Sequence, residues 1–548
     1  MDDIYNEINK VNYLEIRNCH IIISDIPMEL LSNELHQNEL VVILDLLYNL
    51  KDKINNKLII DISFKINNEK EIPDKISFYQ YFLLSFYNFM NIYFNQNQFI
   101  LIRFPQIFQN NNNSNLIIFD YQIELNLLNN RVLINNKEYT LSLNKVNKNN
   151  NQLLSIFSKI LSQIDQNQLL HNYNLFKYNF TCLAGTFDRC HIGHLFLIQS
   201  SLFLCKSHYF IVVCSDEMIK HKGPLSLIQP NFIRRKKIEE IINLNGHNNN
   251  ECLYEVETIY DTVDMAGREK DLNCLIVTTE THKGGLHCNE IRKKNNLKEV
   301  DICTINVINI SLDNVNKISS SIIRKDILNI ISIEKINKLY SEFSNLCMNL
   351  LDIKNKNEID FWWHNTLEHY TKKWKCYHNL NHIYSFLDLF QKYNKYIIND
   401  KNEFLISIFF NDIIYIPSRN DNEEESVNIF NEFFSKTNPK NLNQEKVKEF
   451  ITETKNHLLS KNYSDELNFF MDMDIQIIAD ENWEDYENKI RKEYCYLNDI
   501  EYKNKRKQFL QSLLKKEKIF RTKIFYDDYE QKARNNINNI INRLNTNI

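Results

Sequence analysis

Two histidines three residues apart, His191 and His194, directly follow a turn that contains glycine. The run Cys182-Leu-Ala-Gly-Thr-Phe-Asp-Arg-Cys-His-Ile-Gly-His-Leu195 predicts a strand, a tight turn and the first turn of a helix, in that order. Residues three apart share a helix face, so both imidazoles can meet one ligand. Gly193 between them lets a phosphate approach the backbone, and the helix N-terminus adds oriented N–H groups and a positive dipole end.

This combination of groups suits in-line phosphoryl or nucleotidyl transfer, which depends on positioning and charge stabilisation more than on a protein nucleophile. The alternative is a helix start that carries two surface histidines. The preceding strand and the Gly-Thr-Phe-Asp turn favour the phosphate-handling interpretation over that alternative.

Glycine is rare in this chain and confined to one stretch of it. The seven glycines are Gly185, Gly193, Gly223, Gly246, Gly267, Gly284 and Gly285. Glycine is needed where the backbone turns tightly or lies close to a ligand, so this clustering indicates where the phosphate site lies. No glycine follows Gly285, which excludes a P-loop or a GxGxxG fingerprint downstream and hence a P-loop kinase domain there.

The elements around this motif predict a Rossmann-like domain over residues 175–332. Strand-like segments alternate with helical ones at Phe180–Ala184, Tyr209–Ser215, Glu251–Ile259, Cys274–Thr279 and Ile302–Ile310. This alternation is typical of an α/β fold with a doubly wound parallel sheet, whose ligands bind at the carboxyl ends of the strands.

Two further regions flank this domain. Residues 1–170 read as an α/β region without a catalytic constellation, with strand-like runs at Val41–Leu47, Lys57–Ile62, Phe99–Ile102 and Leu116–Phe119. Residues 335–548 show helical periodicity and hold all four tryptophans, which predicts an all-α domain that begins near residues 332–337.

Bulk composition narrows the classes of protein. A length of 548 residues predicts two to four domains, and a net charge of −5 disfavours a nucleic-acid or anionic-membrane partner. The twelve cysteines form no CxxC pair, the N-terminus lacks the pattern of a signal peptide, and no apolar run reaches the roughly 20 residues of a membrane span. We therefore expect a cytoplasmic protein.

Residues 179–329 resemble the phosphopantetheine adenylyltransferases of the archaeal and eukaryotic type, the module found in eukaryotic bifunctional coenzyme A synthase. The Gly-Thr-Phe-Asp-Arg-x-His-x-Gly-His run is shared with the wider cytidylyltransferase-like superfamily and indicates reaction type more than substrate. More discriminating matches are Cys214–Lys222 with Leu227–Pro230 and Arg234, Thr279–Gly285 with Asn289 and Arg292, and Lys317-Ile-Ser-Ser-Ser-Ile-Ile-Arg324. Two departures are Ser321 in place of threonine and Ala184 in place of the first of two glycines. Residues 1–170 resemble the non-catalytic segment that precedes this module.

The resemblance implies adenylyl transfer from ATP to 4'-phosphopantetheine, giving dephospho-coenzyme A and pyrophosphate, with Mg²⁺ carried mainly by phosphate oxygens. His191 and His194 would bind the ATP phosphates, Thr186 would hold the attacking phosphate, and Lys222 would neutralise charge. The β,γ-phosphates would meet Ser319, Ser320, Ser321 and Arg324. The remaining binding residues that it implies are Gly185, Phe187, Asp188, Gly193, Arg234 and Glu280. A dephospho-coenzyme A kinase would then be a separate protein.

Two of these assignments have structural alternatives. Lys222 ends a Lys220-His-Lys run that can equally be a solvated turn. The three serines before Ile322 can equally be a helix N-cap.

The helical region carries a second set of candidate ligands. His378 and His382 have the i,i+4 spacing that can bring two imidazoles to one metal, and acidic residues follow at Asn411-Asp412, Asp421–Ser426 and Met471–Asp474. The spacing alone favours a buried polar network over a metal site.

Residues 361–544 resemble the predicted metal-dependent phosphohydrolases of the HD superfamily. The matching segments are Tyr377–Ile383, Phe410–Tyr415, Asp421–Glu423, Thr454–His457, Asp472–Asp474, Ile490–Tyr494 and Ala533–Asn535. The defining His-Asp doublet reads Asn411-Asp412 here, and an amide is a poorer transition-metal ligand than imidazole. The resemblance therefore implies the fold with a weakened site for a divalent metal, in which His382, Asp412 and Asp472 are ligands.

Three other functions remain open from the sequence. One is a related nucleotidyltransferase that uses CTP or another acceptor. The second is a metal-dependent phosphohydrolase acting through the helical domain, with the transferase degenerate. The third is a scaffold with neither activity.

Overall fold

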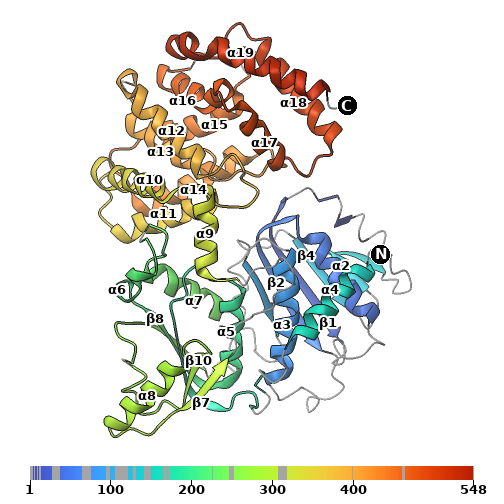
Figure 1. Cartoon of the computed structure of the whole chain (residues 1–548), viewed down its shortest axis with the longest axis vertical. Coiled ribbons are helices and arrows are strands. Elements are labelled where there is room, and N and C mark those ends of the chain that lie inside the picture. The colour runs from blue at the N-terminus through green and yellow to red at the C-terminus, as the bar shows by residue number, and fades with distance from the viewer. Residues whose placement is uncertain are drawn as a thin grey trace. The chain divides into compact units, whose positions relative to one another are not determined.

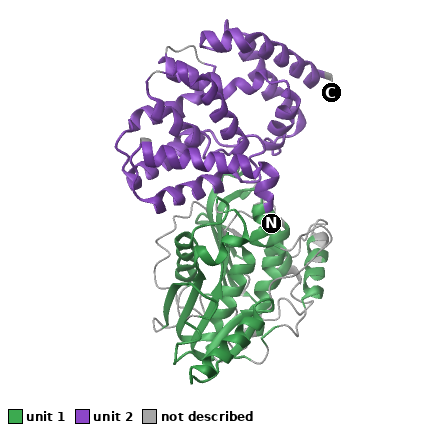
Figure 2. Cartoon of the chain, turned by 60° about the vertical axis from the view of Figure 1, so that its left-hand side comes forward, with its two compact units in different colours: residues 1–324 green, residues 325–548 purple. Residues whose placement is uncertain are grey.

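A computed structural model of the chain describes residues 4, 7–8, 10–11, 14–26, 37–64, 76–93, 99–104, 121–126, 131–140, 150–164, 169–170, 173–224, 226–245, 252–263, 265–305, 318–397, 399–458 and 463–546. The chain divides into two compact units, residues 1–324 and residues 325–548 (Figure 2). Across the described ranges all twelve cysteines are free thiols. No described helix combines the length and the apolar character that crossing a bilayer requires.

The first sheet of unit 1 has six strands in the order β3-β2-β1-β4-β5-β6. Its first four strands are parallel and the last two pairings are antiparallel. The strands are β1 (Ile16–Ile26), β2 (Ile54–Phe64), β3 (Phe99–Arg103), β4 (Tyr121–Asn126), β5 (Arg131–Ile134) and β6 (Lys137–Thr140). The runs Lys57–Ile62 and Phe99–Ile102 are strands as predicted, whereas Leu116–Phe119 lies outside the described residues.

Three helices accompany this sheet: α2 (Gln37–Leu50), α3 (Ile76–Tyr93) and α4 (Asn150–Gln163) (Figure 1). The prediction of a strand at Val41–Leu47 was wrong, because this run is the middle of α2. Nearly all of its side chains are buried. A continuous apolar run does not distinguish a helix that is buried on most sides from a strand.

The second sheet of unit 1 has five strands, all parallel, in the order β11-β10-β7-β8-β9. The strands are β7 (Tyr178–Gly185), β8 (Cys205–Cys214), β9 (Leu253–Ile259), β10 (Cys274–Thr278) and β11 (Asp301–Ile305). They correspond to the five predicted segments, apart from Glu251 and residues 306–310, which lie outside the described residues. The doubly wound Rossmann-type sheet is therefore confirmed.

This strand order reverses between β7 and β10, which is where a doubly wound sheet opens a crevice at its carboxyl edge. The helices of this part are α5 (Ile192–Leu204), α6 (Asp216–Ile219), α7 (Asn231–Asn245), α8 (His282–Lys294) and α9 (Ser320–Ile330), with a short 3₁₀ turn at Lys220–Lys222. Separate apolar clusters cover the two faces of the sheet, as a parallel sheet requires.

The two sheets share a core and are joined by buried polar contacts. Helix α3 packs against α5, and one apolar cluster runs from the first sheet into the second. At the centre, Tyr87 donates to Gln199 Oε1 at 2.7 Å, and Gln199 donates to Asn245 Oδ1 at 2.8 Å. Lys57 on β2 also pairs with Glu240 on α7. The six-stranded sheet is thus a packed part of unit 1.

Unit 2 is helical throughout its described residues. Its helices are α10 (Ile333–Asn345), α11 (Lys356–Tyr370), α12 (Leu380–Tyr393), α13 (Lys401–Phe410), α14 (Asn422–Thr437), α15 (Gln444–Glu453), α16 (Asp465–Ile475), α17 (Trp483–Glu493), α18 (Asp499–Leu514) and α19 (Lys523–Thr546). A π-helical turn at Leu346–Leu350 and short 3₁₀ turns at Asn394–Tyr396, Thr454–Asn456 and Gln476–Ala479 lie between them. The unit begins at Lys325, inside α9, slightly before the boundary near residues 332–337 that the sequence suggested.

Candidate active site

The two histidines of the motif form a reciprocal cap at the start of α5. His191 is the N-cap residue, and its Nδ1 accepts from Gly193 N at 3.1 Å. His194 lies three residues on, and its Nδ1 accepts from His191 N at 3.4 Å. The rings stack with centroids 4.0 Å apart. Since both Nδ1 atoms are acceptors, each neutral ring carries its proton on Nε2 and can donate it to a ligand.

Both imidazoles are neutral at neutral pH. Burial lowers the pKa of His194 to about 4. Burial and the adjacent His194 lower the pKa of His191 well below its usual value. Because the Nδ1 atom of each ring accepts a backbone N–H, each neutral ring presents its Nε2–H as a donor.

The turn between β7 and α5 has an unusual backbone. Phe187 and Arg189 have φ values of 53° and 47°, in the left-handed region that residues other than glycine rarely adopt. A Cβ on Gly185 would lie 2.7 Å from the Phe187 ring, so this position needs glycine. The Phe187 ring is in turn 5.6 Å from that of His194. The turn therefore sets the position of the second histidine.

Asp188 ties this turn to the serine-rich motif far along the chain. It is 1% exposed, accepts from Gln229 N at 3.0 Å, and forms an ion pair with Arg324. Ser320 donates to the Asp188 carbonyl at 2.7 Å. The fold thus brings the start of α9 to the Gly-Thr-Phe-Asp turn, so the two motifs that the sequence suggested as phosphate-binding lie together.

The three serines at the start of α9 all have partners within the protein. Ser319 accepts from Ile322 N at 3.2 Å, which is an N-cap contact, and Arg324 donates to Ser321 Oγ at 3.2 Å. The N-cap alternative left open by the sequence is therefore present in the structure. The same helix end also contacts the Gly-Thr-Phe-Asp turn through Ser320 and Arg324.

Arg234 contacts the Gly-Thr-Phe-Asp turn through the backbone of the turn. Its side chain is fully buried, and it donates to Thr186 O at 2.8 Å and to Gln229 O at 2.7 Å, while it pairs with Asp216 at 2.7 Å. The resemblance suggested direct substrate binding by this residue. Because its guanidinium nitrogens all contact protein groups, the structure instead gives Arg234 a positioning role. The spacing of the motif in the sequence does not predict this positioning role.

Lys222 faces the turn from the end of the segment after β8. Its Nζ donates to Thr186 Oγ1 at 2.7 Å, and its side chain is exposed. The solvated-turn alternative accounts for its exposure but not for this contact. A cation and a hydroxyl therefore lie together at the carboxyl edge of the sheet.

A cavity of about 430 Å³ opens beside this pair. Thr186, Lys222 and Glu280 provide polar groups in its lining. Its walls are mostly apolar, with Val212, Cys214, Met218, Ile259, Leu275 and Val277 among them. Gly285 brings α8 close to β10, since a Cβ there would lie 3.1 Å from Val277. The cavity therefore combines mostly apolar walls with a cation and a hydroxyl that contact each other.

The segment that contains these residues is similar in sequence to known proteins. Residues 182–326 match the cytidylyltransferase-like family. A phosphopantetheine adenylyltransferase of Thermococcus kodakarensis is 36% identical over 152 residues, which cover 28% of this chain and 88% of that protein. The chain belongs to the phosphopantetheine adenylyltransferase family. The protein of that name from Saccharomyces cerevisiae is 26% identical over 132 residues, covering 24% of this chain and 42% of that one.

Family membership makes this chain a nucleotidyltransferase enzyme with a role in coenzyme A biosynthesis. The matched segment includes both histidines, Lys222 and Arg324. Unit 2 lies outside this segment except for its first residues.

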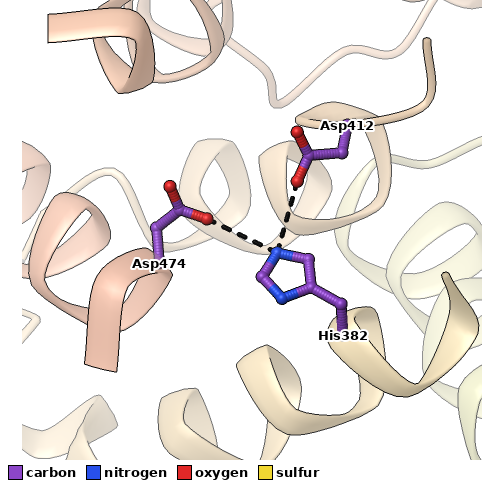
Figure 3. Close-up of side chains that lie close together, drawn as sticks. All are labelled: His382, Asp412 and Asp474. Atoms are coloured by element: carbon purple, nitrogen blue, oxygen red, sulfur yellow. Dashed lines mark ion pairs between the residues drawn. The ribbon is translucent and has the colours of Figure 1, made fainter. Parts of the chain in front are cut away.

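Beyond the adenylyltransferase-family segment, unit 2 contains a cluster of three ligand-type side chains. His382 Nε2 lies 3.3 Å from Asp412 Oδ2 and 3.4 Å from Asp474 Oδ1 (Figure 3). One ligand atom from each residue lies within 4.8 Å of the others. His457 Nε2 is 2.8 Å from the second oxygen of Asp474. Burial opposes a charge on His382, but the two carboxylates outweigh it and raise the pKa of its ring to about 10.

The sequence named Asp472 as the third ligand, and the structure places it elsewhere. Its carboxylate accepts from Arg521 N at 2.8 Å and from Thr522 N and Oγ1 at 2.7 Å each, just before α19. Burial raises the pKa of Asp472 to about 6. Positions two apart on a helix face different ways, so only Asp474 reaches the cluster.

His378 and Asn411 have partners outside the three-residue cluster. His378 Nδ1 is 2.7 Å from Glu493 Oε2, and its ring stacks on that of Tyr415 at 3.7 Å. Asn411 Oδ1 accepts from Thr454 Oγ1 at 3.1 Å. The i,i+4 spacing of the histidines does not give two metal-facing imidazoles, because His378 precedes α12.

Proposed function

We propose that the 182–326 segment transfers an adenylyl group from ATP to 4'-phosphopantetheine, giving dephospho-coenzyme A and pyrophosphate. The observation that carries this proposal is the Thr186–Lys222 pair at the mouth of an apolar cavity, beside the histidine-capped start of α5. The names of the family relatives support the same acceptor. Twelve free thiols suit the reducing conditions of the cytoplasm, which we propose as the location.

In this proposal the acceptor brings its own nucleophile. A phosphate oxygen of 4'-phosphopantetheine, held by Thr186 Oγ1 and Lys222 Nζ, attacks the α-phosphorus of ATP. The bond from that phosphorus to the bridging β-phosphate oxygen breaks, and pyrophosphate leaves with the electron pair. No protein base is required, because the attacking oxygen is already anionic. The pantetheine arm would lie along the apolar walls of the cavity.

The histidine pair would stabilise the charge that accumulates at the α-phosphorus. Each ring has its Nε2–H available, since backbone N–H groups occupy both Nδ1 atoms. Donors held in place before the reaction stabilise a transition state without reorganisation cost. The capping arrangement at the start of α5 supplies that preorganisation.

Mg²⁺ would enter as part of the MgATP substrate. Two nearby carboxylates are already engaged: Asp188 contacts Arg324 and Gln229, and Asp216 pairs with Arg234. Mg²⁺ is commonly held through substrate phosphates and water, with few protein ligands. Arg324 and the start of α9 would face the β- and γ-phosphates.

A direct assay tests this function. The full chain is incubated with MgATP and 4'-phosphopantetheine, pyrophosphate release is followed, and dephospho-coenzyme A is identified by mass. Product should form with ATP and fall to background in His194→Ala. A panel with CTP, GTP, UTP and unphosphorylated pantetheine defines specificity. A preference for CTP, or no product above the His194→Ala control, would overturn the proposal.

We propose, secondly, that His382, Asp412 and Asp474 bind a divalent cation in an HD-like site of unit 2. The supporting observation is the convergence of three ligand atoms within 4.8 Å. Only one imidazole serves this site, so the affinity should be low.

Metal titration of the full chain distinguishes the two aspartates of α16. Mn²⁺ binding, followed by electron paramagnetic resonance, should be lost in Asp474→Asn and retained in Asp472→Asn. Circular dichroism checks that both variants remain folded. Equal loss in both variants, or no Mn²⁺ binding by the parent chain, would refute the site.

A further inference from the structure

Helix α8 carries a buried arginine, Arg292, that takes no part in the proposed chemistry. Its side chain is fully buried, and it does not line the apolar cavity of unit 1. No carboxylate among the described residues pairs with its guanidinium. Burying a charge is costly unless polar groups compensate it, so an arginine at this position needs a structural or functional reason.

Backbone carbonyls provide that compensation. Arg292 Nη1 donates to Ala266 O and to Glu269 O at 2.7 Å each, and Nε donates to Lys298 O at 2.9 Å. The first two carbonyls belong to the segment between β9 and β10, and the third precedes β11. The planar guanidinium therefore joins two segments of the chain to α8, which the single ammonium group of a lysine cannot do in the same geometry.

The segment between β9 and β10 depends on the end of α8 for partners of its carbonyls. Glu269 N donates to Met265 O at 2.9 Å, so residues 265–269 form one helical turn. A helical turn leaves its last carbonyls without a partner inside the turn. Arg292 donates to two carbonyls of this turn, and Asn295 Nδ2 donates to a third, Gly267 O, at 3.1 Å. The end of α8 thus fixes the position of the turn.

The same turn forms part of the wall of the apolar cavity. Met265 and Ala266 of the turn line the cavity, and so do Gly284, Gly285 and Cys288 of α8. This part of the wall therefore consists of the turn and of the helix that holds it. The groups proposed to meet ATP lie on other elements, at the starts of α5 and α9.

We propose that Arg292 is a positioning residue for the acceptor, because it fixes the 265–269 turn so that Met265 and Ala266 form a preformed wall for the pantetheine arm. This inference rests on the proposed adenylyl-transfer function. A preformed wall lowers the cost of ordering the site when the acceptor binds. The wall meets the arm and not the reacting phosphate, so its loss should raise the KM for the acceptor and leave kcat nearly unchanged.

Arg292→Lys tests this role, because it keeps the charge and loses the fork of donors. The KM for 4'-phosphopantetheine should rise about tenfold, whereas kcat and the KM for ATP should each change by less than about twofold. Lys294→Ala changes an exposed lysine at the end of the same helix and should leave all three constants unchanged. Met265→Ala should act in the same direction, and its effect should not add to that of Arg292→Lys, because both changes act on one wall.

A milder variant and a direct readout of the turn guard against misfolding. Asn295→Ala removes one donor to the same turn from an exposed residue, so it should raise the acceptor KM by a smaller factor. Hydrogen exchange in peptides that cover residues 265–269 should be faster in Arg292→Lys and in Asn295→Ala, and unchanged in Lys294→Ala. If circular dichroism shows that Arg292→Lys does not fold, Asn295→Ala decides the question.

The outcomes separate this role of Arg292 from the proposed function. A parent chain that forms no dephospho-coenzyme A would overturn the function, and the positioning role with it. Product formed by the parent chain, together with an unchanged acceptor KM in Arg292→Lys and in Asn295→Ala, would overturn the positioning role alone. Equal increases in the KM for ATP and for the acceptor, or unchanged hydrogen exchange in the 265–269 turn, would also overturn that role alone.

Discussion

Lys222 Nζ lies 2.7 Å from Thr186 Oγ1, so a cation from the segment after β8 meets the hydroxyl of the turn after β7. Thr186 follows β7, and Lys222 ends the 3₁₀ turn that comes after β8; the two strands are parallel neighbours whose carboxyl ends share one edge of the sheet. Replacing Lys222 by alanine removes a charge from the place where the proposed acceptor phosphate binds. Loss of one such preorganised group typically costs about 10² to 10³ in rate, so we expect kcat/KM to fall by roughly that factor.

The matched control for this prediction is Lys220→Ala. Lys220 belongs to the same Lys-His-Lys turn but pairs with Glu217 at the surface. Steady-state pyrophosphate release should be close to that of the parent chain in this variant. A change of less than threefold in Lys222→Ala would contradict the role assigned to Lys222.

The ion pair between Asp188 and Arg324 should contribute strongly to the stability of unit 1. Asp188→Ala leaves a guanidinium buried without a counter-charge, and breaking a buried pair in this way costs about 3 to 5 kcal/mol. Hydrogen exchange of peptides from β7 and α9 measures the local free energy of opening. The double variant Asp188→Ala/Arg324→Met should lose less than Asp188→Ala alone, because no unpaired charge remains. A double variant less stable than the single one would count against this account.

The histidine pair predicts a specific dependence of stability on pH. The pKa of His194 is about 4 in the folded chain and 6.5 as the reference value, so the unfolded chain binds more protons between these values. The free energy of unfolding of unit 1 should therefore have its full value above pH 6.5 and should decrease as the pH falls toward 4. His194→Gln keeps an acceptor for the cap but does not titrate, so its stability should vary less over this window.

Urea denaturation at pH 4.5, 5.5, 6.5 and 7.5 measures this effect, with tryptic peptides of unit 1 as the readout. His287→Gln is the control, because His287 is an exposed residue on α8 that contacts Glu290. The stability of the His287→Gln variant should depend on pH in the same way as that of the parent chain. Equal profiles for the parent chain and His194→Gln would show that His194 is not held neutral by the fold.

Features that follow from a local sequence pattern could be predicted from the sequence. The turn, the capped helix and the five strands of the second sheet could be predicted because glycine placement and apolar runs report local geometry. The strand β1 was missed, although it lies at the centre of the first sheet. The helix at Val41–Leu47 was mistaken for a strand, since a fully apolar run has no periodicity to distinguish the two.

Roles that depend on tertiary contacts could not be predicted in the same way. Arg234 sits in a motif, yet only the fold reveals that Thr186, Gln229 and Asp216 occupy its guanidinium. Asp472 and Asp474 look equivalent in sequence, and the choice between them depends on which face of α16 meets His382. A cavity within unit 2 is lined by residues between Tyr377 and Phe509, which are too far apart in the sequence for a local pattern to indicate it.

The buried contacts between the two sheets predict that residues 1–170 stabilise the transferase segment. Tyr87 donates to Gln199 on α5, the helix that His191 caps, and also accepts from Ile102 N at 3.2 Å. Tyr87→Phe removes this hydroxyl and leaves Gln199 Oε1 and Ile102 N without their partner. Each buried polar group left unsatisfied lowers the stability by about 1 to 3 kcal/mol. We expect the urea midpoint of unit 1, followed by pulse proteolysis, to fall clearly below that of the parent chain. Tyr260→Phe removes a hydroxyl from a side chain that is 74% exposed and should leave the midpoint unchanged. Equal midpoints for the two variants would mean that the sheets do not stabilise one another through this contact.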